Sequence, residues 1–237
     1  MEEYLLYSNR EYIRKYGFEQ FIKLLSENSI KLNLNSNYIT NYITCQEIEL
    51  LFKSHRFQFI KELYLNNNGI DIIGIKLIAE ILKTNKSLTV LSLEYNIICS
   101  ESVKYIAESL KNNKYLIILN LCNNNIDNKG AEYIAELLII NKFLLDMDLS
   151  FNYIGVKGIE LIIKSLELNK SLIHLNLSFN GSSDGIIGRN ELLKNNKINR
   201  DKILKERAEE KIYFAIFLQI FIHRKIEFLE FFDELNY

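Results

Sequence analysis

Residues 88–98 read LTVLSLEYNII, and residues 116–126, 28 residues further along the chain, read LIILNLCNNNI. Both stretches follow the phrase Leu-x-x-Leu-x-Leu-x-x-Asn-x-Ile. The phrase returns at residues 144–154 and 172–180, and an earlier copy lies at residues 60–70. A fixed period of this length is typical of an array in which each repeat stacks against its neighbours.

The first half of each unit has the two-residue period of a short strand. With Leu88 counted as position 1, Leu91 and Leu93 point inward from positions 4 and 6, whereas Ser92 and Glu94 point outward from positions 5 and 7. An asparagine follows at position 9, and its side chain can satisfy backbone groups that the bend removes from the sheet. We predict that these asparagines form a structural ladder and bind no ligand: Asn68, Asn96, Asn124, Asn152 and Asn180.

The second half of each unit has the period of a helix. Apolar residues at i, i+3, i+4 and i+7 form one helical face, as in Ala131, Ile134, Ala135 and Leu138. An asparagine comes just after each face, where a residue that tolerates the left-handed conformation can end a helix. These residues are Asn85, Asn113, Asn141 and Asn169. Glycines recur near the helix starts, which indicates close packing there: Gly74, Gly130 and Gly158.

Each unit is therefore predicted to be a strand, a turn, a helix and a return. Strands stack about 4.8 Å apart, whereas helices are roughly 10 Å across, so the array must curve with its strands inside. The sequence predicts an α/β solenoid, with a parallel sheet on the concave side and helices on the convex side.

The phrase and its period resemble leucine-rich repeats of the ribonuclease-inhibitor-like subclass. Similar repeats occur in the recognition half of intracellular nucleotide-binding immune receptors, in Ran GTPase activators and in proteins of host-associated microbes. The resemblance implies the fold and a role in protein binding, but it names no partner, because one fold serves many functions. No glycine-rich phosphate loop is present, so the nucleotide-binding half of those receptors has no counterpart here.

The ends of the array depart from the repeat. Leu32 and Leu34 start a further copy with a longer insertion near residues 45–58. We expect an N-terminal helical cap or degenerate repeat at residues 1–28, about six units at residues 29–196, and a C-terminal helical cap at residues 197–237. An open solenoid end exposes its core, which favours the cap for this apolar tail. The rival interpretation is self-association through residues 212–232, or association with a membrane surface.

Composition and sequence pattern argue against several classes of function and location. The 237 residues carry a net charge of −1, which argues against a nucleic-acid or membrane partner chosen by bulk charge. No apolar stretch is long enough to predict a membrane span, and the N-terminus lacks the apolar run of a secretory signal peptide. We therefore expect a cytoplasmic protein, or one delivered into a host cytosol without such a signal. Cys45, Cys99 and Cys122 have neither disulfide nor metal-site spacing.

The outward strand positions and the adjoining turn are free of packing demands, so we expect partner contacts there. Tyr95, Phe151 and Phe179 share position 8, and aromatic anchors flanked by charge are typical of binding hot spots. The alternative is that these rings shield the strand ends. The candidate partner-binding residues on the concave face are Glu62, Tyr64, Glu94, Tyr95, Asn120, Asn123, Asp146, Asp148, Phe151, His174, Asn176 and Phe179.

No catalytic residue, cofactor site or metal site is predicted. Asp146 and Asp148 alternate on one strand face, but without a cleft they form a solvated acidic patch. His174 lies across from Asp146 with no nucleophile beside it. The leading hypothesis is a non-enzymatic module that binds a partner protein as an adaptor, inhibitor or effector-like protein. The alternatives are a GTPase activator resembling Ran GTPase activators, and homotypic assembly or membrane-surface association through the C-terminal tail.

Overall fold

The computed structural model describes residues 13, 15–25, 30–35, 44–169 and 171–181. The described elements belong to one compact unit, Met1–Gly185, and form a parallel sheet of six strands in chain order. The strands are β1 (Lys31–Asn33), β2 (Glu62–Tyr64), β3 (Val90–Ser92), β4 (Ile118–Asn120), β5 (Asp146–Asp148) and β6 (His174–Asn176). This confirms the predicted fold class.

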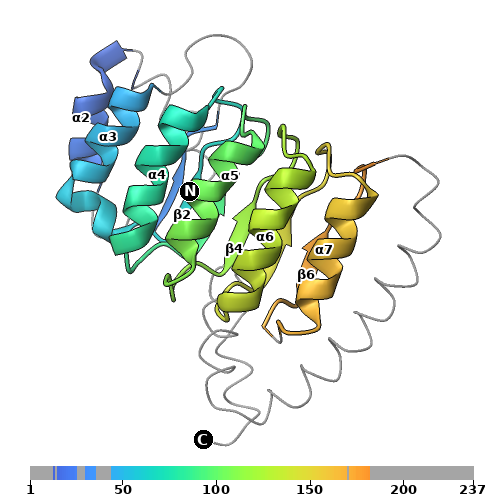
Figure 1. Ribbon diagram of the computed structural model, residues 1–237. Coiled ribbons are helices and arrows are strands. Elements are labelled where there is room, and N and C mark those ends of the chain that lie inside the picture. The colour runs from blue at the N-terminus through green and yellow to red at the C-terminus, as the bar shows by residue number, and fades with distance from the viewer. Residues whose placement is uncertain (1–12, 14, 26–29, 36–43, 170, 182–237) are drawn as a thin grey trace, which may run out of the picture. The chain divides into compact units, whose positions relative to one another are not determined.

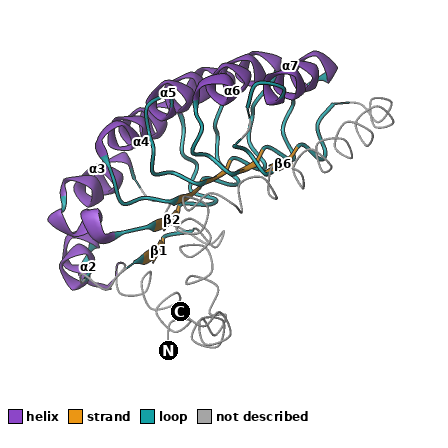
Figure 2. Ribbon diagram, turned by 90° about the horizontal axis from the view of Figure 1, so that it is seen from below, coloured by secondary structure: helices purple, strands orange, loops and turns teal. Residues whose placement is uncertain are grey.

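Helices cover one face of this sheet (Figures 1 and 2). They are α2 (Phe18–Leu24), α3 (Cys45–Lys53), α4 (Ile72–Thr84), α5 (Ser100–Leu110), α6 (Asn128–Ile140) and α7 (Val156–Leu166). From β2 onward each strand pairs with the next at the 28-residue interval, for example Leu91 with Leu119 and Leu119 with Met147. Every unit therefore presents the same positions to the same surface.

The core lies between the sheet and the helices. The inward strand residues Leu91 and Leu93 are buried completely, and so are Ile106 on α5 and Ile134 on α6. The two sequence periods therefore selected the buried faces correctly. The longer insertion after β1 contains α3 and a short 3₁₀ helix, His55–Phe59, in which Phe57 is buried.

The asparagines that follow the helices behave differently from the prediction. Asn85 and Asn141 end α4 and α6 in extended conformation, with φ near −70° in both, so neither is a left-handed cap. Instead, the side chain of Asn141 donates to the carbonyl oxygens of Leu110 and Asn113 at 2.7 and 3.1 Å. Its Oδ1 accepts from the N–H groups of Phe143 and Leu144, both at 2.8 Å.

This arrangement recurs and forms a second asparagine ladder, made of Asn113, Asn141 and Asn169. Asn113 donates to the carbonyl of Leu82, and Asn169 donates to that of Leu138, both at 2.7 Å. All three side chains are buried. The second ladder therefore ties the end of each helix to the turn that follows the next helix.

The glycines near the helix starts allow neighbouring units to approach closely. A Cβ at Gly158 would lie 2.7 Å from Oδ1 of Asn128 and 2.8 Å from Cβ of Ala131. At the matching place in α5, Ser102 is accommodated and fully buried. Whether this helix position requires glycine therefore depends on the side chains that the adjacent unit places against it.

We expect Gly158→Ala to lower the free energy of unfolding by about 2 kcal/mol, because Ala131 is fixed by its helix and cannot move aside. Urea denaturation followed by circular dichroism measures the change. The matched control is Lys157→Ala at the exposed neighbouring position, which should alter stability by less than about 0.5 kcal/mol. Equal stability of the two variants would contradict the close-packing explanation.

The predicted caps lie wholly or partly outside the described residues. Within residues 1–28, α2 is described and buries Phe18, Phe21 and Ile22. The C-terminal segment 197–237, including the self-association candidate 212–232, is outside the described residues. Both boundaries stay predictions.

Candidate functional site

The first asparagine ladder lies inside the array. The side chain of Asn96 donates to the carbonyl oxygens of Leu65 and Leu93 at 3.0 and 2.9 Å. Its Oδ1 accepts from the N–H groups of Asn68 and Ile70 at 3.0 and 2.9 Å. Asn124, Asn152 and Asn180 repeat the donor pattern, and the five asparagines are only 2–7% exposed. Such side chains are not available to a partner.

The residue just before each ladder asparagine has a left-handed backbone. At position 8, φ lies between 53° and 57° in the five units for which this residue is described: Asn67, Tyr95, Asn123, Phe151 and Phe179. The backbone is fixed there by the sheet ladder, since the N–H of Tyr95 donates to the carbonyl of Cys122 and that of Phe151 to the carbonyl of Ser178. Asparagine tolerates this conformation, whereas a bulky aromatic residue is strained in it.

The three aromatic side chains at position 8 are exposed to solvent. Tyr95 and Phe151 are each 47% exposed, and Phe179 is 69% exposed. The rings of Phe151 and Phe179 stack with their centroids 4.2 Å apart and their planes at 17°. We call Tyr95, Phe151 and Phe179 the aromatic turn residues. They occupy the edge at which the strands end and the chain turns toward the helices.

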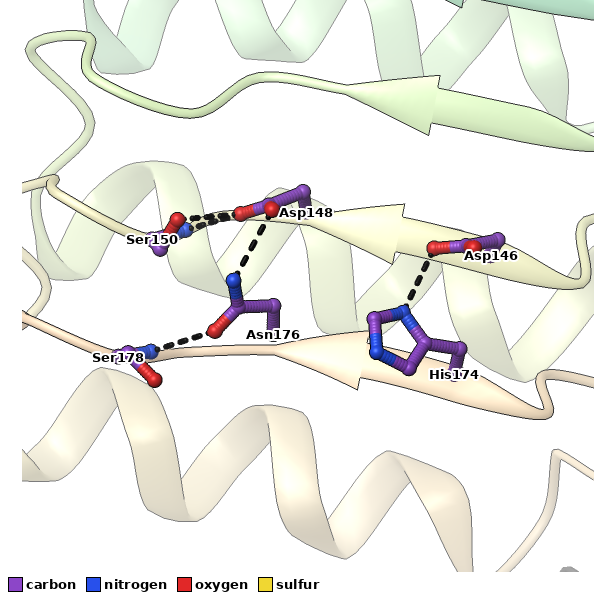
Figure 3. A network of polar contacts seen from close by, with 6 residues as sticks. All are labelled: Asp146, Asp148, Ser150, His174, Asn176 and Ser178. Carbon is purple, nitrogen blue, oxygen red and sulfur yellow. Dashed lines mark hydrogen bonds and ion pairs between the residues drawn. The ribbon is translucent and has the colours of Figure 1, made fainter.

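Beside this edge, polar side chains on the sheet face form a network across β5 and β6 (Figure 3). Oδ1 of Asp148 accepts from the N–H and the hydroxyl of Ser150 at 2.8 and 2.5 Å. Its other oxygen, Oδ2, accepts from the amide of Asn176 at 3.0 Å, and Asn176 in turn accepts from the N–H of Ser178. These bonds hold the Asp148 carboxylate in one orientation.

The same local bond occurs in the unit before. Oδ1 of Asn120 accepts from the N–H of Cys122 at 2.8 Å, and its amide donates to Glu94 at 3.3 Å. The position-5 side chain therefore fixes the backbone at the strand end and also lies on the exposed sheet face.

Burial is the main reason that the pKa of Cys122 is raised, so this thiol is not an activated nucleophile.

His174 and Asp146 form a separate exposed pair, with Nδ1 of His174 2.8 Å from Oδ1 of Asp146 (Figure 3). At the opposite end of the sheet, the Glu62 carboxylate is nearly buried and lies 3.4 Å from Nζ of Lys31. The Tyr64 hydroxyl donates to Glu62 at 2.8 Å. Burial, together with this bond to Glu62, raises the pKa of Tyr64 well above its usual range.

The predicted surface residues thus fall into four groups in the structure. Asp146, Asp148, His174 and Asn176 gather on β5 and β6, and Glu94 reaches Asn120 on β4. Glu62 and Tyr64 form their own group on β2. The aromatic turn residues and Asn123, which share position 8, lie along the strand ends.

The sheet face is acidic although the whole chain is nearly neutral. Four acids occupy its outward positions, and the only two basic side chains among its described residues, Lys31 and His174, each pair with one of the acids. The acids are Glu62, Glu94, Asp146 and Asp148. Glu94 and Asp148 accept from neutral donors, so their negative charge faces a partner with little compensation.

The described residues contain no cluster of three or more His, Cys, Asp or Glu side chains arranged to hold a metal ion. Cys45, Cys99 and Cys122 are free thiols. No helix in the described ranges has the length and apolar character needed to cross a bilayer.

Comparison with known proteins agrees with the architecture. A family model described as Leucine Rich repeat matches residues 112–135. Among solved structures, actin-binding site 2 of leiomodin-1 is similar with a TM-score of 0.55 at 24% identity, covering 70% of this chain and 95% of that chain. A search of curated proteins gave no match.

Two further solved structures are more distant. The C-terminal domain of tropomodulin from Caenorhabditis elegans has a TM-score of 0.47 at 15% identity and covers 82% of this chain and 97% of its own. An internalin from Listeria monocytogenes has a TM-score of 0.37 at 20% identity and covers 62% of this chain and 47% of its own. The repeated strand register, the family match and the likeness to leiomodin-1 show that this chain contains an α/β leucine-rich repeat solenoid.

Proposed function

We propose that this protein is a non-enzymatic module that binds a partner protein through the sheet face and the adjoining aromatic turn residues. The observation that carries the proposal is the left-handed backbone of three exposed aromatic residues. Strained conformations of this kind cost about 1–3 kcal/mol each and concentrate at functional sites.

The repeats themselves provide the comparison that separates function from folding. Asn67 and Asn123 occupy the same position with the same φ and the same ladder bonds. The turn therefore forms with a residue that suits it better than an aromatic one. Shielding of the strand ends does not account for the aromatic side chains, because two of the five units have none.

The chemistry of the face indicates the chemistry of the partner. Fixed carboxylates beside stacked rings suit a partner surface that carries basic side chains around an apolar anchor. Because Asp148 and Glu94 are already held by hydrogen bonds, binding orders few groups on this side of the interface. The helix in each unit and the 28-residue period also support assignment to the ribonuclease-inhibitor-like subclass.

The likeness to the actin-binding site 2 of leiomodin-1 is a likeness of fold at 24% identity. Actin is therefore a defined first candidate for a direct test, and co-sedimentation of the full chain with filamentous actin provides it. Retention of a different protein in an interaction screen would leave the proposed surface intact and assign it another partner.

The double substitution Phe151→Asn and Phe179→Asn separates binding from stability. Asparagine relieves the left-handed strain, while the lost ring stack costs about 0.5–1.5 kcal/mol, so stability should change by less than about 1 kcal/mol. Partner affinity should fall about 100-fold, the effect of removing a hot spot. Quantitative pull-down identifies the partner, and calorimetry with the purified partner measures the loss.

Leu50→Ser provides the control, since Leu50 is an exposed apolar residue on α3, away from the aromatic turn residues. It should leave affinity unchanged. Recovery of the same partner at equal affinity by wild type and by the asparagine double variant would refute the proposed site.

A further inference from the structure

The turns that lead from each helix back to the next strand differ in charge from the turns at the other edge of the array. Every unit runs in the same direction, so these return turns all lie at one edge (Figure 1). Among the described residues from 85 to 173 they contain four lysines and one acid, Glu167: the lysines are Lys86, Lys111, Lys114 and Lys142. The strand-to-helix turns between residues 65 and 155 contain Asp71, Glu94 and Asp127 and no basic residue.

The lysine-rich edge also exposes large apolar side chains. Five of them, from three successive units, are 39–63% exposed: Tyr115, Ile139, Ile140, Phe143 and Leu168. The ammonium of Lys142 links two of these units, because it donates to the carbonyls of Ile139 and Leu168 at 2.6 and 3.3 Å. We call these five apolar residues the return-turn patch.

Comparison between repeats shows that the fold does not require this patch. Ser87 and Ser171 occupy the place that Tyr115 and Phe143 take in the two middle units. Lys83 and Thr84 stand where α6 ends with two exposed isoleucines. Polar residues therefore complete the same turn elsewhere in the array.

Two of the lysines have an ordinary structural role, Lys111 and Lys142. Nζ of Lys111 lies 3.8 Å from a carboxylate oxygen of Glu136. Cations near helix C-termini offset the helix dipole, and Lys142 does so through its two carbonyl contacts. Lys86 and Lys114 are exposed, and their ammonium groups make no hydrogen bond or ion pair with another described residue. Their charge is available to an external ligand.

We propose that the return-turn patch and its lysines bind the surface of an anionic lipid membrane. Each of the three turns supplies a short apolar tip, and lysines flank these tips, as in interfacial insertion beside anionic headgroups. The cations in these turns are all lysines, compact point charges that suit a diffuse negative surface better than a planar, bidentate partner. The net charge of −1 does not oppose this contact, because salt screens the acidic groups at the other edge from the membrane surface.

This inference does not rest on the proposed protein-binding function. The aromatic turn residues lie where the strands end, whereas the return-turn patch lies where the helices end. One surface can therefore bind a protein while the other contacts lipid, and either function can fail alone.

Vesicle flotation with the full chain tests the proposal. Wild type should float with vesicles of phosphatidylcholine containing about 30% phosphatidylserine, and much less with phosphatidylcholine alone. Phe143→Ser combined with Leu168→Ser should lower partitioning at least about tenfold. Lys86→Gln combined with Lys114→Gln should lower it about tenfold or more, and about 0.5 M salt should weaken wild-type binding.

Tyr153→Ser is the matched control, because Tyr153 is even more exposed but lies at the opposite edge. It should float as wild type does, and circular dichroism should show every variant folded. Failure of wild type to float, equal flotation with neutral vesicles, or equal loss in the control would overturn the proposal. Sedimentation velocity distinguishes a further outcome: self-association abolished by the Phe143 and Leu168 variant, without lipid binding, would assign the patch to a second copy instead.

Discussion

Asn124→Ala should lower the free energy of unfolding by about 4 kcal/mol, the largest effect that we expect from one polar substitution. The Asn124 amide donates to the carbonyls of Leu93, Leu121 and Cys122 at 3.0–3.1 Å. Its Oδ1 accepts from the N–H of Ile98, a completely buried residue. Alanine leaves the buried N–H of Ile98 without a partner, which costs about 1–3 kcal/mol. It also removes one hydrogen bond to each of the three carbonyls, at about 0.5–1.5 kcal/mol per bond, although each carbonyl keeps another donor.

Chemical denaturation of the full chain, followed by circular dichroism, measures this loss. Asn125→Ala is the control, since Asn125 is the exposed next residue, and its stability should stay within about 0.5 kcal/mol of wild type. A difference of less than about 1 kcal/mol between the two variants would show that the ladder bonds contribute little.

Much of this arrangement was predictable from the sequence. The two-residue and helical periods select the buried faces, and the 28-residue interval places equivalent residues on neighbouring strands. The contact between His174 and Asp146 follows from that interval alone. Repetition makes such inference possible because each position is sampled several times in one chain.

The left-handed aromatic residues were not predictable from local preference. Phenylalanine and tyrosine disfavour positive φ, so their sequence neighbourhood gives no signal for it. The sheet ladder imposes the conformation, since the N–H of the position-8 residue bonds to the next unit at Asn67, Tyr95, Asn123 and Phe151. The signal that could have revealed it was the asparagine at the same position in two repeats, Asn67 and Asn123.

The acidic network on the sheet face was predicted as a surface but not as a set of fixed bonds. The structure adds that both oxygens of Asp148 accept hydrogen bonds. Side-chain pairing between strands depends on rotamers and on the position-7 hydroxyl of Ser150, which the period does not specify. The return-turn patch was missed for a related reason, because its members are dispersed in sequence and gather only through the topology.

Asn141 provides the sharpest contrast between the two roles that an asparagine can have at a helix end. A left-handed cap tolerates glycine as well as asparagine or better, so Asn141→Gly would then be neutral or stabilising. The structure instead gives Asn141 an extended backbone and four side-chain hydrogen bonds that glycine cannot make. We expect Asn141→Gly and Asn141→Ala each to lower the free energy of unfolding by about 3–4 kcal/mol.

Equilibrium denaturation of the two variants decides between these roles, with Lys142→Ala as the neighbouring comparison. Lys142 is exposed and bonds to two carbonyls at helix ends, so its loss should cost no more than about 1 kcal/mol. A glycine variant as stable as wild type would support the capping role. It would also show that the second ladder does not stabilise the contact between successive units. Similar losses in the glycine and alanine variants would instead show that the side chain stabilises the turn, because the two residues differ in left-handed preference but share the absence of an amide.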